Sequence, residues 1–129
     1  MDERAVETAG KMSEALETLE RARGHLYSFH QLIGEADCAL DEVLEGLRAC
    51  GEDDLAERLE TELLGRNVIP GRWTFQIVEE FDDGYWEVFR GHERAVREAL
   101  TGGRRHVHEA GMKERRRTHG QPGHEARPG

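Results

Sequence analysis

Large aliphatic residues recur every seven positions through the first part of the chain. The repeating positions are Leu19, Leu26, Ile33, Leu40 and Leu47. A spacing of seven keeps side chains on one stripe of an α-helix, because seven residues make nearly two turns. Ser13 can cap the start of such a helix and Gly51 can end it. The pattern therefore predicts one long helix between these two residues.

A second heptad row lies beside the first and is polar in its middle. It contains Leu16, Arg23, His30, Asp37 and Leu44. Arg, His and Asp must find partners once water leaves a packed face, and successive members are about 10 Å apart, so the partners must come from another element. We interpret Arg23, His30 and Asp37 as a buried polar row that fixes the packing register, with part of a ligand site as the alternative. On the opposite flank, small and apolar residues widen the apolar face: Ala22, Phe29, Ala36, Val43 and Cys50.

The chain then turns back on itself. Residues 52–54 are acidic and suit the first turn of a second helix, which Gly65 ends. With the first helix this makes a helical hairpin with a very short turn. The dipeptide Pro70-Gly71 predicts a turn in the loop that follows.

The segment from Trp73 to Leu100 has two interpretations. As a helix, it carries a stripe at three- and four-residue spacing, namely Val78, Phe81, Tyr85, Val88, His92, Ala95 and Ala99. As a β-hairpin, its first residues alternate between apolar and polar and Asp83-Gly84 supplies a two-residue turn. We favour the helix because the period continues smoothly to Leu100. The alternative is an α+β fold with a hairpin at 73–90.

These patterns predict a mainly α fold in which a long-helix hairpin forms a three- to four-helix bundle. The helical domain spans 13–103, a basic helix 104–118, and the flanking segments 1–12 and 119–129 are expected to be disordered. The first helix would be roughly 55 Å long, far longer than the second. We therefore expect a second copy of the chain to cover the remainder, giving a homodimer, with a monomeric bundle as the alternative.

Charge separates the body from the C-terminal end. The formal net charge is -9, but residues 1–100 hold 24 acidic and 11 basic side chains, whereas residues 101–129 hold 3 acidic and 7 basic ones. An acidic body repels nucleic acid, so any such contact would go through the basic tail. No apolar run approaches the roughly 18 residues of a membrane span, and the N-terminus lacks the apolar core of a signal peptide. We expect a cytoplasmic protein without membrane contact.

A metal or ligand site is the main chemical alternative to a structural role. His92 falls on the stripe of the third helix, and the carboxylates Glu80, Asp83 and Glu87 run along one side of it. Antiparallel packing of the first and third helices would bring His30, Asp37 and His92 toward one of these carboxylates, a nitrogen and oxygen set compatible with a divalent metal. However, none of the seven histidines follows a Glu by three residues, the spacing that di-iron helical bundles use. No cofactor is favoured.

Two blocks carry a resemblance to known sequences. They are His25-Leu26-Tyr27-Ser28-Phe29-His30-Gln31-Leu32 and the run from Gly65 to Phe81. In these blocks the chain resembles a family of small uncharacterised helical proteins of high-GC actinobacteria. The resemblance implies a bacterial cytoplasmic protein and assigns no functional residue.

The sequence thus favours a non-enzymatic helical module that self-associates and binds other proteins. The runner-up is a bundle that holds a divalent metal or a small polar ligand between the first and third helices. The chain has no nucleotide-binding or nucleophile motif to favour an enzyme.

Overall fold

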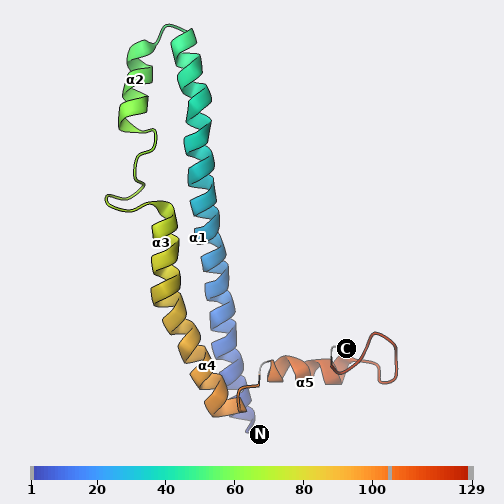
Figure 1. Cartoon of the computed structure of the whole chain (residues 1–129). Coiled ribbons are helices and arrows are strands. Elements are labelled where there is room, and N and C mark those ends of the chain that lie inside the picture. The colour runs from blue at the N-terminus through green and yellow to red at the C-terminus, as the bar shows by residue number, and fades with distance from the viewer. Residues whose placement is uncertain (1, 105, 128–129) are drawn as a thin grey trace. The chain divides into compact units, whose positions relative to one another are not determined.

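The computed structural model describes residues 2–104 and 106–127, which fold mainly as helices (Figure 1). The α-helices are α1 (Glu3–Ala49), α2 (Asp53–Glu62), α3 (Thr74–Phe81), α4 (Glu87–Thr101) and α5 (Val107–Arg116). A π-helical turn, Asp82–Trp86, joins α3 directly to α4. The described residues contain no β-strand and only an isolated bridge between Ile69 and Arg72. The prediction of a mainly α fold is confirmed, and the alternative of a hairpin at 73–90 is wrong.

The chain divides into two compact units. Unit 1 takes its described residues from Met1–Glu20 and Trp86–Gly129, and unit 2 is Arg21–Tyr85. Helix α1 contributes its first part to unit 1 and the remainder to unit 2. Gly24 and Gly34 do not interrupt this helix.

Helix α1 begins at Glu3, ten residues before the predicted start at Ser13. The expectation that residues 1–12 are disordered is therefore wrong for residues 3–12. The heptad rows continue into this stretch, because Ala5 and Met12 extend the first row and Ala9 extends the second. Ala9 is buried and Ala5 and Met12 are half-buried. The stripe is difficult to recognise in the sequence, because alanine gives only a weak apolar signal in a polar segment.

Within unit 2, the covered face of α1 consists of the two heptad rows. Leu44 is buried, and Leu26, Ile33, Leu40 and Leu47 are half-buried, as are the three polar members of the second row. The flank expected to widen the core is exposed instead, from Ala22 through Phe29 and Val43 to Cys50. The other elements of unit 2 thus pack over the polar row, and the more apolar flank faces outward.

Helix α2 runs back along α1, as the short turn predicts. Gly51 has φ +78°, and Arg48 of α1 forms an ion pair with Glu60 of α2. After α2, the Pro70-Gly71 turn is closed by a hydrogen bond from Arg72 N to Ile69 O of 2.9 Å. Gly71 has φ +78°, the value that the third position of a type II turn requires.

The π-helical turn shifts the covered face of the third helical segment by one residue. The predicted stripe continues from Val78 to Tyr85, Val88 and His92, but these last three residues are exposed. The covered positions from the end of the turn onward are Trp86, Phe89, Arg90, Glu93, Val96, Arg97, Leu100 and Thr101. A π turn accommodates one extra residue, so every later side chain is displaced on the helix surface. The placement of His92 on a core stripe is therefore wrong.

Helix α4 ends at a pair of glycines. Gly102 and Gly103 have φ +62° and +82°, and Gly103 N donates to Arg97 O at 3.1 Å, which closes the helix end. After α5, the segment 117–127 forms turns, and Arg117 Nη1 donates to His124 O at 3.1 Å. None of the described helices is long and apolar enough to cross a bilayer.

Candidate functional site

The polar row on α1 finds a partner for each of its three members within unit 2. Arg23 makes a two-point contact with Asp82, from Nε to Oδ1 at 2.8 Å and from Nη2 to Oδ2 at 3.0 Å. The Tyr27 hydroxyl donates to Asp82 Oδ2 at 2.9 Å. The Arg23 and Asp82 side chains are 25% and 18% exposed, so the pair is half-buried rather than sealed.

These contacts shift the pKa values of Asp82 and Tyr27, the two partners of the Arg23 guanidinium. The hydrogen bond from Arg23 lowers the pKa of Asp82 below its ordinary value, with a smaller contribution from the Tyr27 hydroxyl. The same carboxylate raises the pKa of Tyr27, because the hydrogen bond to Asp82 favours the protonated phenol. At neutral pH the site is therefore a carboxylate held between a guanidinium and a neutral phenol.

We expect Asp82→Asn to lower the free energy of unfolding by about 1–2 kcal/mol near neutral pH, because it removes a charge-assisted, partly screened pair. Asp82 has a depressed pKa in the folded chain, so its contribution is present above the unfolded pKa of about 3.9 and is lost as pH falls through the folded value. The difference between wild type and variant in urea unfolding should shrink toward zero in acid. Asp83→Asn, at the exposed neighbouring position, is the control; a difference for Asp82→Asn that persists in acid would contradict the ion-pair explanation.

His30, the second member of the row, contacts the start of α3. His30 Nδ1 lies 2.6 Å from Thr74 Oγ1, and Thr74 is the first residue of that helix. The neighbouring Gln76 side chain accepts a hydrogen bond from Trp73 N at 3.0 Å, which satisfies one free donor of the helix start. His30 is therefore tied to the point where the loop becomes α3.

Asp37, the third member of the row, accepts a hydrogen bond from the backbone that follows α2. Gly65 N donates to Asp37 Oδ1 at 2.9 Å, and Gly65 has φ +70°. Beside this contact lies an open groove of about 330 Å³. Its walls combine aliphatic side chains with a few polar groups: Ile33, Ala36, Asp37, Leu40, Leu63, Arg66, Asn67 and Val68. The groove is large enough for a small molecule or for side chains of a partner.

The other residues considered for a ligand site form contacts of their own, separate from those of the polar row. Glu80 pairs with Arg72, at 3.0 Å between Oε1 and Nε, and Glu87 lies 3.7 Å from Arg90 within α4. Asp83 and His92 are exposed. In residues 2–104 and 106–127, no group of three or more His, Cys, Asp and Glu is arranged to hold a metal ion.

Asp82 and Thr74 are the partners that sequence reasoning did not name. Asp82 belongs to the acidic run 79–83, whose five residues offered several equivalent carboxylates. The contact with Arg23, a residue 59 positions away, distinguishes Asp82 from the other carboxylates, and no local pattern in the sequence indicates it. Thr74 could not be identified as a partner from the sequence, because the segment that begins at Trp73 could be interpreted as a helix or as a hairpin.

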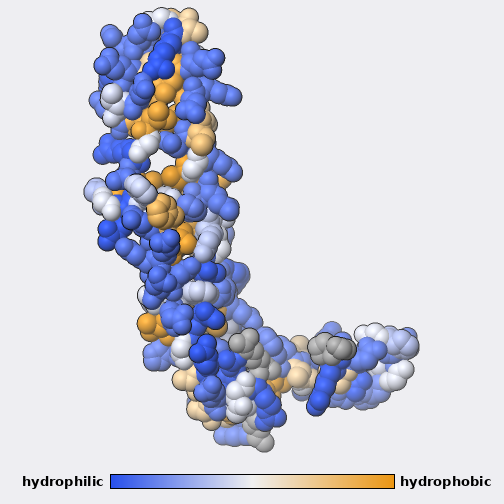
Figure 2. All heavy atoms as spheres, viewed as in Figure 1, coloured by the Kyte–Doolittle hydropathy of each residue, from blue (hydrophilic) through white to orange (hydrophobic). Residues whose placement is uncertain are grey.

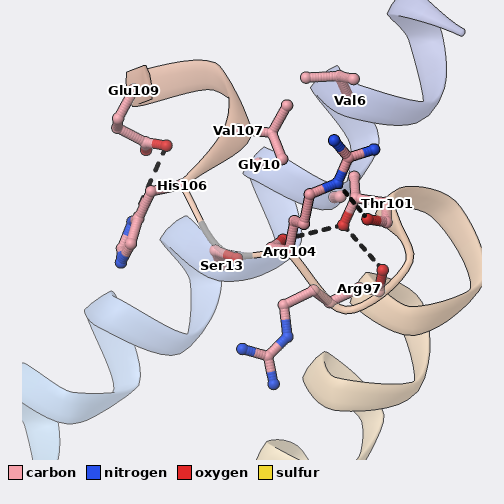
Figure 3. A pocket seen from close by; sticks show the side chains of 10 residues that line it. Val6, Gly10, Ser13, Arg97, Thr101, Arg104, His106, Val107 and Glu109 are labelled. Carbon is pink, nitrogen blue, oxygen red and sulfur yellow. Dashed lines mark hydrogen bonds and ion pairs between the residues drawn. The ribbon is translucent and has the colours of Figure 1, made fainter. Parts of the chain in front are cut away.

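Unit 1 holds a second polar cluster, at the end of α4 (Figure 3). Glu93 and Arg97 form an ion pair with 3.7 Å between Oε2 and Nε, and their side chains are only 8% and 9% exposed. Arg97 Nε makes no hydrogen bond to any described residue. In Figure 3 its side chain points away from Thr101 and Arg104.

The cavity lined by Arg97, Thr101 and Arg104 is too small for a ligand. Its volume of about 10 Å³ is at the lower limit for one water molecule. The Thr101 hydroxyl lies 2.8 Å from Arg97 O and 3.0 Å from Arg104 O, and its single proton bonds to one of them at a time. These contacts close the end of α4 (Figure 3).

The basic C-terminal segment is partly neutralised by its own residues. Glu114 accepts from Arg117 Nε at 2.8 Å and contacts His119 Nε2 at 2.7 Å. Arg117, followed by His119, lowers the pKa of Glu114 to about 2. The negative charge of Glu114 is therefore retained at every physiological pH.

The comparisons with known proteins add no relative to this picture. No protein-family model, curated protein or solved structure matches the chain.

Proposed function

We propose that this chain is a non-enzymatic helical module that self-associates and binds other proteins. The observation that carries the proposal is the amount of apolar side chain left at the surface. Among the described residues, the buried apolar core is limited to Ala9, Leu44, Ala56 and Val78. So small a core is typical of domains that gain stability by association.

Large apolar side chains are exposed over unit 2 in particular. They include Phe29, Leu32, Val43, Leu55, Leu63, Val68, Ile69, Trp73 and Phe75. Figure 2 shows hydrophobic residues at the surface between α1 and α2, bordered by hydrophilic ones. Contiguous apolar surface with a polar border is a common mark of protein–protein contact.

The polar row supports an interaction module over an enzyme. Arg23, His30 and Asp37 each bond to a different element of unit 2, namely the π turn, the start of α3 and the loop after α2. Polar pairs on a packed face select one register, because any other register leaves charges without partners. Rigid pairing of this kind presents the exposed face of α1 in a constant conformation.

A small polar ligand remains the second candidate, and the groove beside Asp37 is the observation in its favour. Its lining offers aliphatic walls with Asp37, Arg66 and Asn67 as polar contacts. We propose this groove, between α1 and the residues that follow α2, as the ligand site in place of one between the first and third helices. A divalent metal has no comparable support in the described residues.

Solution mass tests the proposal. Sedimentation equilibrium or light scattering at about 50 µM is expected to give twice the chain mass of 14.7 kDa, since a dissociation constant near 1 µM would leave few free chains. Dilution should shift the mass toward one chain. A single-chain mass throughout this range would contradict self-association.

A further inference from the structure

Helix α1 carries an apolar stripe in unit 2 that the fold does not use. Ala22, Phe29, Ala36 and Val43 follow one another at heptad spacing, with Leu32 beside them. All five are exposed, Phe29 by 42%, Val43 by 45% and Leu32 by 60%. We call Ala22, Phe29, Ala36 and Val43 the outer stripe.

The outer stripe alternates small and large side chains. In a parallel pair of helices, each residue would meet its own copy, so Phe29 would face Phe29 and alanine would face alanine. In an antiparallel pair centred near Leu32, Phe29 faces Ala36 of the partner subunit and Val43 faces Ala22 of the partner subunit. Large side chains opposite small ones are what close packing of two helices requires.

A charged row flanks the outer stripe, and its centre lies one residue nearer the N-terminus than that of the stripe. It consists of Arg21, Ser28, Glu35 and Glu42, also at heptad spacing and all exposed. Antiparallel pairing sets Arg21 opposite Glu42 of the partner subunit and Ser28 opposite Glu35 of the partner subunit. In a parallel pair this row and its copy would lie on opposite sides of the contact, so Arg21 would not meet Glu42 of the partner subunit. Size and charge therefore select the same orientation, and the registers that they favour differ by only about 3 Å along the helix axis, which long side chains can span.

We infer that the outer stripe is the self-association surface, and that it pairs antiparallel with a second copy so that Phe29 packs against Ala36 of the partner subunit. This rests on the proposed self-association and adds its surface, orientation and register. The contact is isologous, so it closes at two chains instead of growing into a filament.

Cysteine cross-linking tests the orientation. Cys38 and Cys50 are both free and exposed, so Cys38→Ser with Cys50→Ser provides a background without reactive thiols. Ala22→Cys and Val43→Cys are then made in separate chains. Mixed and oxidised, they should give a disulfide joining one chain of each kind, because their Cβ atoms approach closely only in the antiparallel register. Each chain oxidised alone should stay largely uncross-linked. Efficient self-linking of each chain, without the mixed product, would overturn the orientation.

A charge placed in the stripe tests the surface itself. Ala36→Glu should weaken self-association at least about tenfold in sedimentation equilibrium, because it buries an unpaired carboxylate. Gln31→Glu adds the same charge to an exposed position of α1 outside the stripe and should leave the mass unchanged. Arg21→Glu should weaken the pair, and adding Glu42→Arg should restore it. Circular dichroism establishes that each variant is folded.

The outcomes separate the two proposals. Wild type with the mass of one chain removes the self-association on which this inference rests. Wild type with the mass of two chains, together with an Ala36→Glu variant of the same mass, leaves self-association standing and overturns the outer stripe as its surface.

Discussion

Replacing Glu93 by leucine is expected to lower the free energy of unfolding by about 3–5 kcal/mol, because it leaves Arg97 charged and buried without its carboxylate. Both side chains are nine-tenths buried, and the 3.7 Å separation is long for a charge-assisted bond. Arg97 Nε has no hydrogen-bond partner among the described residues, so no other described acceptor at this atom would offset the loss.

The double variant Glu93→Leu with Arg97→Met separates the cost of an orphaned charge from the value of the pair. It is expected to be as stable as wild type, or more stable by about 1–4 kcal/mol, since it removes both desolvation penalties. Urea unfolding of wild type, single and double variants measures this difference.

The exposed pair on the same helix is the matched control. Glu87 and Arg90 also lie 3.7 Å apart, but their side chains are 61% and 38% exposed. Glu87→Leu should change the free energy of unfolding by less than about 1 kcal/mol. Equal effects of Glu93→Leu and Glu87→Leu would contradict the burial argument.

Leu44→Ala is the second change with a large expected effect, a loss of about 2–4 kcal/mol in the free energy of unfolding. Leu44 is only 5% exposed and is the one large aliphatic of α1 that is fully covered in the described part of unit 2. Truncation removes its transfer free energy and leaves a cavity among side chains that relax only partly.

Leu55→Ala is the control, because Leu55 is 47% exposed in α2. It should cost less than about 1 kcal/mol. All variants are compared at one protein concentration, since association makes the unfolding midpoint depend on concentration. A Leu44→Ala variant as stable as Leu55→Ala would show that the face of α1 in contact with α2 is not the core.

Polar pairing recurs on the covered faces of both units. Unit 2 uses Arg23 with Asp82 and His30 with Thr74, and unit 1 uses Glu93 with Arg97. Such pairs add little net stability, because desolvation offsets much of the attraction. Their effect is to penalise slipped registers, which a uniform leucine face would tolerate. The proposed association through the outer stripe would benefit from a constant register.

The helical class, the heptad rows of α1 and the helix ends at glycine could all be predicted from the sequence alone. The sequence also indicated that Arg23, His30 and Asp37 need partners from other elements. These follow from local rules, since helix periodicity, glycine conformations and the cost of burying charge do not depend on the remainder of the chain. The start of α1 at Glu3 was not predicted, because Ala5 and Ala9 carry too little apolar surface to mark a stripe. The partners of these three residues, and the flank of α1 that is covered, depend on how distant parts of the chain pack together. The π turn that begins at Asp82 makes that choice for α4: one extra residue in the turn moves Glu93 to the covered side and His92 to the exposed side. Asp82 itself follows buried Val78 by four residues, so the phase of α3 places it on the covered side. Because the turn is stabilised by contacts made from distant positions, such as Arg23 to Asp82, no pattern within the segment predicts it.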